Sequence, residues 1–212
     1  MVSVVLRNRN EEQHIGLSIQ SVIDSLGLGC EIILVDNNST DESLQVAGLF
    51  DMANIKYFNL SKNYTPGKAL NLGVEKATNE TILILSAHAQ ITKLNINIVE
   101  EYLSVHKAVF GHQTPIYRGK KISPRYIWSH FTENEVVNMY SNIENRLFLH
   151  NAFCFYNKSF LLDNPFDNNL SGKEDRYWAK DIVDQGFSYL YTNLLRVNHY
   201  WTPNGATWKG LG

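Results

Sequence analysis

The residues best suited to chemistry stand where apolar runs stop. The run from Ile82 to Leu85 ends on Ser86-Ala-His88, and the first strand-like run of the chain ends on Arg7 to Glu11. In an open α/β sheet, ligands bind beyond the carboxyl ends of the strands. We therefore take these polar residues as candidate site residues, together with two further groups, Asp36 to Asp41 and Glu174-Asp175.

His88 lies between two alanines, so it is the side chain of that turn most able to do chemistry. A neutral imidazole binds Mn²⁺ or a similar ion through one nitrogen, whereas Mg²⁺ prefers oxygen ligands. His199 ends a late strand-like stretch and is the candidate second ligand. The alternative is a structural histidine with satisfied hydrogen bonds, and the local sequence leaves both interpretations open.

Glu174 and Asp175 begin a segment in which Tyr177, Trp178 and Ile182 recur at helical spacing. Acidic residues in a first helical turn gain about 0.3–1 kcal/mol from the helix dipole, which accounts for both residues without any function. A general base for a hydroxyl group benefits instead from partial burial, which raises the pKa of a carboxyl. The aromatic neighbours favour burial, and the pattern does not decide between the two effects.

Asp36 ends a second apolar run and is suited to accept hydrogen bonds from a nucleobase or ribose. The alternative is a turn aspartate held by Asn37, Asn38 and Ser39. Lys68 and Asn71 place a cation and an amide near a helix start, where the helix dipole also favours phosphate. A solvated surface lysine is the competing interpretation.

The elements that position these residues alternate between strands and helices, which predicts an α/β fold with a mainly parallel central sheet flanked by helices. Ser39 or Thr40 is expected to cap the helix after the second strand. Continuous apolar runs predict strands, and apolar residues at helical spacing predict helices. The expected strands are 2–6, 31–35, 55–59, 81–86, 108–111, 151–156, 187–191 and 195–200, and the clearest expected helices are 15–26, 64–77, 95–107 and 172–185.

The regular alternation breaks down between residues 112 and 150. This stretch is rich in aromatic residues and loop signals, including Trp128 and Phe131. We expect an insert that covers a substrate, with a mobile surface loop as the alternative.

Composition excludes several classes of protein. The chain has 212 residues, which predicts one domain, and its net charge of -2 lacks the basic bias of nucleic-acid binders. Its apolar runs fall far below the roughly 18 residues of a membrane-spanning helix, and no signal peptide is visible, so we expect a cytoplasmic protein. Cys30 and Cys154 are expected to be buried thiols. A glycine-rich dinucleotide loop and a P-loop are both absent, which disfavours NAD, FAD and P-loop chemistry.

Six motifs, in this order, resemble the inverting family 2 glycosyltransferases of the GT-A fold, especially the bacterial rhamnosyltransferase-like branch. The resemblance covers most of the chain. The motifs are Val2-Ser-Val-Val-Leu-Arg-Asn-Arg-Asn-Glu11, Glu31-Ile-Ile-Leu-Val-Asp-Asn-Asn-Ser-Thr-Asp41, Gly67-Lys-Ala-Leu-Asn-Leu-Gly73, Ile84-Leu-Ser-Ala-His-Ala89, Gly172-Lys-Glu-Asp-Arg-Tyr-Trp-Ala179 and Val197-Asn-His199.

The resemblance implies roles for individual residues. Asp175 would be the base that deprotonates the acceptor hydroxyl, and Glu174 would orient it. The family's metal-binding Asp-x-Asp falls on Ser86-Ala-His88, so both aspartates are replaced. His88 and His199 would then form a modified Mn²⁺ or Mg²⁺ site. Asp36 would contact the donor base, and the remaining donor-binding residues would be Arg7, Asn10, Glu11, Ser39, Lys68, Asn71, Ser86 and Ala87.

The implied function is transfer of a sugar, with inversion, from a UDP-, dTDP- or GDP-linked donor to a hydroxyl of a glycan or lipid-linked acceptor. Such a reaction would serve bacterial surface polysaccharide synthesis at the inner face of the cell membrane, with peripheral membrane association. Residues 1–110 would form a Rossmann-like nucleotide-sugar half, and 111–212 the acceptor and catalytic-base half of one domain. The alternatives are a non-catalytic member that binds sugar nucleotide or glycan and a nucleotidyltransferase, whose glycine-rich phosphate loop is missing.

Overall fold

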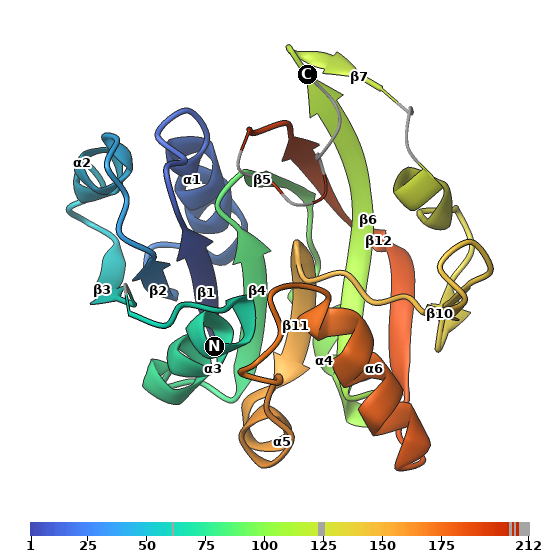
Figure 1. Ribbon diagram of the computed structural model, residues 1–212. Coiled ribbons are helices and arrows are strands. Elements are labelled where there is room, and N and C mark those ends of the chain that lie inside the picture. The colour runs from blue at the N-terminus through green and yellow to red at the C-terminus, as the bar shows by residue number, and fades with distance from the viewer. Residues whose placement is uncertain (61, 123–125, 204, 206, 208–212) are drawn as a thin grey trace.

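The strongest apolar runs of the sequence form the centre of one sheet. The computed structural model describes the chain except residues 61, 123–125, 204, 206 and 208–212. Within that part, ten strands form a sheet whose main path is β3-β2-β1-β4-β11-β6-β12-β5, with β7 beside β6 and β8 beside β12 (Figure 1). The strands are β1 (Val2–Asn8), β2 (Glu31–Asp36), β3 (Asn54–Asn59), β4 (Thr81–Ser86), β5 (Ala89–Lys93), β6 (Ala108–Tyr117), β7 (Lys120–Lys121), β8 (Val136–Val137), β11 (Phe153–Asn157) and β12 (Tyr189–Tyr200).

Helices and one small hairpin complete the described part of the chain. The hairpin pairs β9 (Tyr140–Ser141) with β10 (Arg146–Leu147) outside the main sheet. The helices are α1 (Ile15–Leu26), α2 (Ser43–Gly48), α3 (Pro66–Lys76), α4 (Ile96–Val105), α5 (Lys158–Asp163) and α6 (Glu174–Asp184), with a 3₁₀ turn, η1, at Tyr126–His130.

The first four strands of the path are parallel, and their register sets the position of the site. β1 lies between β2 and β4, with Arg7 opposite Ser86 and Asn8 opposite Asp36. Because parallel strands end at the same edge, these polar residues meet at the carboxyl edge of the sheet. The predicted strands and helices of this half are confirmed within one or two residues at most ends.

The second half of the sheet is mixed. β11 is antiparallel to both β4 and β6, β12 runs parallel to β6, and β5 is antiparallel to β12. The predicted α/β architecture with a central sheet flanked by helices is therefore confirmed, and its parallel character belongs to the first half. Antiparallel strands enter where the sequence stops alternating between strands and long helices.

Two hydrophobic cores cover the two faces of the sheet. On one face, α3, α5 and α6 contribute Leu70, Leu161 and Trp178 to a core that includes Val5 of β1. On the other face, α1 and α4 pack apolar residues against the alternate side chains of the same strands. Figure 1 shows α3 and α6 in front of the sheet and α4 behind it. Burial on both faces explains why the central strands are apolar without alternation.

Two local predictions were wrong, and one strand was not predicted. The helix after β2 begins at Ser43 with Glu42 at its N-cap, so neither Ser39 nor Thr40 caps it. The Ser39 hydroxyl donates to Asp36 instead. The two late strand pieces are one strand, β12, with a register shift between Thr192 and Arg196. β5, directly after His88, was not expected.

Of the two predictions for the stretch 112–150, a covering insert and a mobile surface loop, the second does not fit the structure at residues 127–131. β6 continues to Tyr117, and Trp128 and Phe131 are buried in the same core as Phe148. These contacts contradict a mobile surface loop at residues 127–131. Among the described helices, none is both long and apolar enough to cross a membrane.

Candidate active site

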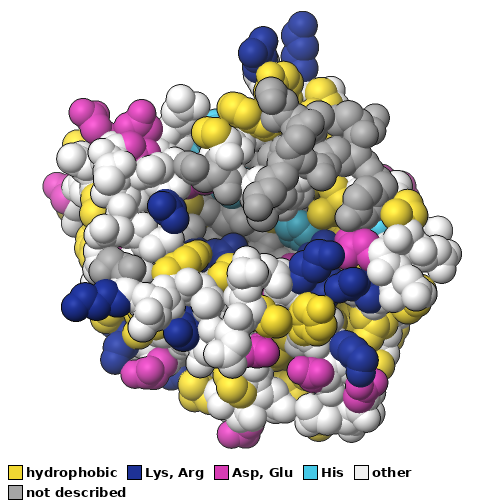
Figure 2. All heavy atoms as spheres, in the orientation of Figure 1, with side chains coloured by type: hydrophobic (Ala, Val, Ile, Leu, Met, Phe, Trp, Pro, Cys, Tyr) yellow, Lys and Arg dark blue, Asp and Glu magenta, His cyan; other side chains and the backbone are white. Residues whose placement is uncertain are grey.

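A cavity of about 360 Å³ opens at the carboxyl ends of β1 and β4, beside the start of α6. Figure 2 shows the surface hollowed near its centre, with His and with Lys or Arg side chains on the right side of the hollow. Five of the predicted site residues line this cavity: Arg7, Ser86, His88, Glu174 and Asp175.

The first turn of α6 delivers both predicted acidic residues to the cavity. Lys173 precedes the helix in the left-handed conformation, with φ 63°, and turns the chain into α6. Glu174 and Asp175 are both buried, with exposed fractions of 5% and 6%. Their place in the first turn agrees with the helix-dipole interpretation, and their place in the cavity with the catalytic one.

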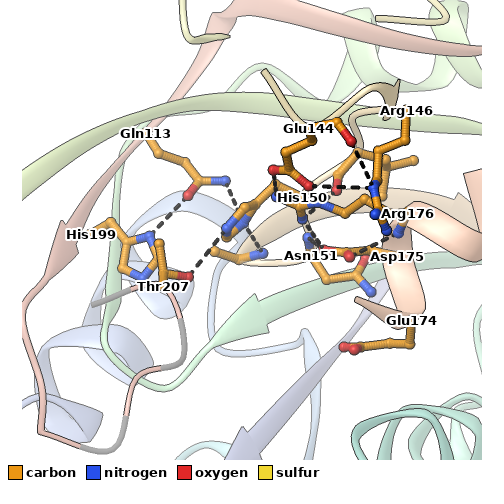
Figure 3. Close-up of polar contacts among 12 residues, drawn as sticks. Gln113, Glu144, Arg146, His150, Asn151, Glu174, Asp175, Arg176, His199 and Thr207 are labelled. Atoms are coloured by element: carbon orange, nitrogen blue, oxygen red, sulfur yellow. Dashed lines mark hydrogen bonds and ion pairs between the residues drawn. The ribbon is translucent and has the colours of Figure 1, made fainter. Parts of the chain in front are cut away.

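Asp175 is held by three hydrogen bonds (Figure 3). Its Oδ1 accepts from the backbone N–H of Arg176 at 2.9 Å, and its Oδ2 accepts from the Asn151 N–H at 3.1 Å and the Arg176 guanidinium at 2.8 Å. A carboxylate offers about four acceptor positions, so one remains for a hydroxyl in the cavity. The carboxylate is therefore held in one orientation, with an acceptor position left over.

Glu174 differs from its neighbour in its electrostatic surroundings. Its Oε1 accepts from the Arg7 guanidinium at 3.3 Å. Burial raises the pKa of Glu174, the charge of Arg7 acts against that, and the adjacent Asp175 raises the pKa further, so the net shift is upward. The two carboxyls thus differ: Asp175 is bonded to Arg176, and Glu174 has a raised pKa.

A chain of hydrogen bonds fixes the tautomers of two histidines behind the cavity (Figure 3). The Ala152 N–H can only donate, so His150 Nδ1 accepts from it at 3.2 Å and also from the Gln113 amide nitrogen at 3.1 Å. Gln113 Oε1 then faces His199 Nδ1 at 2.9 Å, and this ring nitrogen must donate. Neutral His199 therefore carries its lone pair on Nε2. Burial lowers the pKa of His199, and the charges of His88 and His150 lower it further.

His88 is oriented in the same way by a carboxylate. Its Nδ1 lies 3.1 Å from Glu11 Oε1, and because a carboxylate only accepts, Nδ1–H donates. The other carboxylate oxygen, Glu11 Oε2, is buried and has no hydrogen-bond partner among the described residues. A buried carboxylate oxygen of this kind would be satisfied by a cation or a donor brought by a ligand.

The two predicted metal ligands, His88 and His199, lie next to each other, and they suit Mn²⁺ better than Mg²⁺. The His88 and His199 ring centroids lie 4.9 Å apart, and each ring donates through Nδ1 to an oxygen, as metal-bound histidines do. Imidazole nitrogens suit Mn²⁺ and suit Mg²⁺ poorly. In the described part of the chain, no three His, Cys, Asp or Glu side chains form a complete metal site. The pair thus fits Mn²⁺ only if a bound ligand supplies the other donors.

The loop after β2 is organised by Asp36. The Asp36 carboxylate accepts from Asn8 Nδ2 at 2.8 Å, from the Ser39 hydroxyl at 2.6 Å and from the Ser39 N–H at 2.9 Å. Ser39 Oγ accepts in turn from the Asn10 N–H, and Asn10 Oδ1 accepts from Thr40 N–H. The bonds from Ser39 agree with the interpretation of Asp36 as a turn aspartate. The amide that donates to Asp36 is that of Asn8, not that of Asn37 or Asn38 as expected. Neither Asp36, Asn10 nor Ser39 lines the cavity beside α6.

Four other predicted donor-binding residues also lie outside that cavity: Glu11, which orients His88, and Lys68, Asn71 and Ala87. Lys68, in the first turn of α3, donates to the Asn63 carbonyl at 3.1 Å. Asn71 is occupied by structural bonds, since it donates to the Phe166 carbonyl and accepts from the Phe166 N–H. Ala87 is fully buried in the core on the α1 side of the sheet.

Sequence reasoning missed His150, Asn151, Arg176 and Gln113. Arg176 follows Asp175 directly, and this adjacency is the one sequence signal that could have pointed to it. The other three come from β6 and from the segment before β11, where no local pattern marks them. They reach the site because β11 and β6 pair next to β4.

Comparison with known proteins gives consistent results. The family model "Glycosyl transferase family 2" matches residues 3–166. An uncharacterized glycosyltransferase of Haemophilus influenzae is 29% identical over 89 residues, covering 41% of this chain and 36% of that protein. The poly(ribitol-phosphate) beta-N-acetylglucosaminyltransferase TarS of Staphylococcus aureus is 24% identical over 210 residues, covering 92% of this chain and 33% of TarS. The match thus spans about a third of the length of either relative.

Solved structures show the same fold. S. aureus TarS 1-349 in complex with UDP-GlcNAc aligns with a TM-score of 0.74 at 20% identity, covering 100% of this chain and 61% of that one. GalNAc-T7 with UDP, GalNAc and Mn²⁺ aligns with a TM-score of 0.71 at 17% identity, covering 97% and 44%. The predicted GT-A fold is confirmed by these neighbours. Since the family model spans more than half of its 212 residues, the chain belongs to glycosyl transferase family 2.

Proposed function

We propose that this chain is the catalytic domain of an inverting glycosyltransferase that uses a nucleoside-diphosphate sugar. The observation that carries the proposal is the placement of Glu174 and Asp175, which the first turn of α6 brings into a cavity at the carboxyl ends of β1 and β4. Nucleotide ligands bind at this edge of open α/β sheets. UDP is the favoured nucleotide, because the TarS structures were solved with UDP or UDP-GlcNAc.

The reaction is a single displacement. The Asp175 carboxylate takes the proton of an acceptor hydroxyl while that oxygen forms a bond to the anomeric carbon of the donor sugar. The bond from the anomeric carbon to the β-phosphate oxygen breaks, and its electron pair leaves with the nucleoside diphosphate. Attack opposite the leaving group inverts the anomeric centre.

The chain's own groups divide the remaining work. Arg176 and the Asn151 N–H hold the Asp175 carboxylate in place, and Glu174 orients the acceptor hydroxyl. Arg7 lines the cavity at the end of β1, whereas the predicted Lys68 does not line it, so Arg7 is assigned to offset charge on the diphosphate. The Asp36 loop at the end of β2 is assigned to the donor base. Residues 1–110 would thus bind the donor, and 111–212 the acceptor.

His88 and His199 are the residues that would hold Mn²⁺ together with the donor diphosphate. Bound Mn²⁺ supplies positive charge beside the departing diphosphate. Calorimetric titration of UDP with and without Mn²⁺ tests this assignment. UDP should bind at least about tenfold more tightly with Mn²⁺, by roughly 1.4 kcal/mol, and His88→Ala should remove the difference. Equal UDP affinity in both conditions would refute the metal site.

The activity itself is tested with a panel of UDP-, dTDP- and GDP-sugars, by following release of the nucleoside diphosphate. Asp175→Asn should lower turnover by about 10²–10⁴-fold, the usual contribution of a general base. Asp181→Asn is the matched control, because Asp181 is an exposed aspartate of the same helix. Equal turnover by wild type and Asp175→Asn would exclude Asp175 as the base.

One observation favours a second function, a non-catalytic member that binds sugar nucleotide or glycan. The Asp-x-Asp position holds Ser86-Ala-His88, and no complete metal site is formed by the described residues. Nucleotide binding without turnover, across the whole panel and with Mn²⁺ present, would establish that function.

The acceptor is proposed to be a glycan or lipid-linked chain of bacterial surface polysaccharide. TarS, by its name, glycosylates a poly(ribitol-phosphate) chain, which supports this class of acceptor. A lipid-linked acceptor would place the protein at the inner face of the cell membrane by peripheral association. Sedimentation with vesicles that carry the lipid-linked acceptor is the corresponding measurement.

A further inference from the structure

A second cavity, of about 340 Å³, lies beside the candidate active site, between the β9–β10 hairpin and α6. The hairpin supplies Tyr140, Asn145 and Arg146, and α6 supplies Arg176 and Tyr177. Leu147 and Lys180 complete the lining. Figure 2 shows Lys and Arg side chains gathered near the start of α6, on the side of the hollow where this hairpin lies.

The lining carries three cations and no carboxylate: Arg146, Arg176 and Lys180. Arg176 is buried, is bonded to Asp175 and to the Leu149 carbonyl, and is paired with Glu144 at 3.6 Å. Arg146 is paired with Glu144 at 3.9 Å, and Lys180 with Asp184 one turn further along α6. Their side chains are nevertheless 36% and 62% exposed, so part of each cation stays open to solvent at the rim. Guanidinium and ammonium groups at a cavity rim favour phosphate or carboxylate groups.

Two tyrosines give the same cavity apolar walls. Tyr140 and Tyr177 are 51% and 44% exposed, which is high for residues of this size. The Tyr140 hydroxyl donates to Asn145 Oδ1 at 2.6 Å, and the Arg146 guanidinium lies 5.9 Å from the centre of the Tyr177 ring. These contacts hold the rings and the guanidinium in place before any ligand arrives. Aromatic faces between polar groups suit a ligand whose units have apolar C–H faces and polar edges, such as a sugar or polyol.

Arg176 joins this cavity to the candidate active site, because it lines both. Its guanidinium donates to the Asp175 carboxylate, which is the proposed base. A chain lying in the second cavity would therefore continue past Arg176 towards Asp175. We propose that the cavity between the β9–β10 hairpin and α6 is an acceptor subsite for an anionic glycan or polyol chain that carries phosphate or carboxylate groups.

The role as an acceptor subsite rests on the proposed glycosyltransferase function, whereas the binding itself is tested separately. Calorimetry with the full chain would use three probes: a glycerol-phosphate hexamer, an oligogalacturonide hexamer and neutral maltohexaose. At least one anionic hexamer should bind at least about tenfold more tightly than maltohexaose, and the better one identifies phosphate or carboxylate. Maltohexaose affinity equal to that of both anionic hexamers would overturn the proposal.

Two variants locate the binding. Arg146→Gln and Lys180→Gln should each weaken binding of the preferred hexamer by about tenfold, the effect of losing one charge-assisted hydrogen bond. Both residues are partly exposed, so the fold is retained, and Lys93→Gln, an exposed lysine of β5, is the control. Unchanged affinity in both variants would also overturn the proposal. Anionic binding that needs Arg146, in a protein without any sugar transfer, would refute the proposed function and leave the site intact.

Discussion

At the scale of single residues, the site depends on groups that fix the state of their neighbours. Gln113 is the clearest case, because its amide has one orientation that satisfies both His150 and His199. The unambiguous donor at the start of this chain is the Ala152 N–H. A glutamine without contact to the cavity therefore decides where the His199 lone pair lies.

This arrangement predicts the histidine tautomers. In protein labelled with ¹⁵N-histidine, long-range proton–nitrogen spectra should show His199 protonated on Nδ1 and His150 on Nε2. Gln113→Ala should allow His199 to populate the other tautomer, whereas Gln20→Ala, at an exposed glutamine of α1, should not. Wild-type His199 protonated on Nε2 would contradict the hydrogen-bond assignment.

Arg7 and Glu174 give a second prediction at this scale. Burial raises the pKa of Glu174, and the nearby Arg7 charge is the largest of the influences that oppose that rise. Arg7→Gln should therefore raise the pKa of the Glu174 carboxyl further, so that it takes up its proton at higher pH. A ¹³C titration of the glutamate carboxyls measures this shift. Lys62→Gln, at an exposed lysine of the turn before α3, should leave the Glu174 titration unchanged. If Glu174 titrates in Arg7→Gln as it does in wild type, the ion pair is excluded.

At the scale of elements, α3 packs closely against β1 at Gly73, where there is no room for a side chain. A Cβ built on Gly73 would lie 2.4 Å from Val5 Cγ1, well inside normal contact. Val5 is fully buried in β1, between β2 and β4. The close approach of α3 to β1 therefore requires glycine, although alanine is the better helix former.

Gly73→Ala should destabilise the protein by about 1–3 kcal/mol, because overpacking outweighs the gain in helix propensity. Gly48→Ala is the matched control, since a Cβ at Gly48 meets no atom within 4 Å. Urea unfolding measures both, and adding Val5→Ala should reduce the effect of Gly73→Ala. A stabilised Gly73→Ala variant would show that α3 does not pack as closely as described.

At the scale of the whole molecule, the two halves differ in how far sequence predicts them. β1, β2 and β4 are continuous apolar runs that end on polar turns, so their boundaries and the residues they present, Arg7 and His88, follow from local patterns. β6 and β12 carry polar residues within their length. The apolar pattern therefore predicts only the first part of β6 and divides β12 into two strands. Gln113 and His150 come from that half. Their contacts join residues far apart in the chain, and local patterning carries no information about such pairs.

The opposite edge of the sheet gives the last prediction, which concerns the stability of the whole fold. Glu31, at the start of β2, accepts hydrogen bonds from Ser3 of β1, Lys56 of β3 and the Thr78 N–H before β4. Burial alone would raise the pKa of Glu31, but these three donors outweigh it and lower the pKa to about 2. One carboxylate thus links four neighbouring strands at the amino edge, away from the candidate site.

Because the folded pKa lies below the ordinary value of 4.5, the contribution of Glu31 is fully present above that value and is lost as the pH falls towards 2. Glu31→Gln should lower the free energy of unfolding at pH 7 by about 1–3 kcal/mol, because buried donors lose their charged acceptor. Between pH 5 and 3 the variant should lose less stability than wild type, because it has about one fewer group whose pKa differs between the folded and unfolded states. Urea unfolding at each pH measures the two curves. Glu75→Gln, at an exposed helix position, should follow the wild-type curve. Parallel curves for Glu31→Gln and wild type would mean that folding does not lower the pKa of Glu31, and would contradict this prediction.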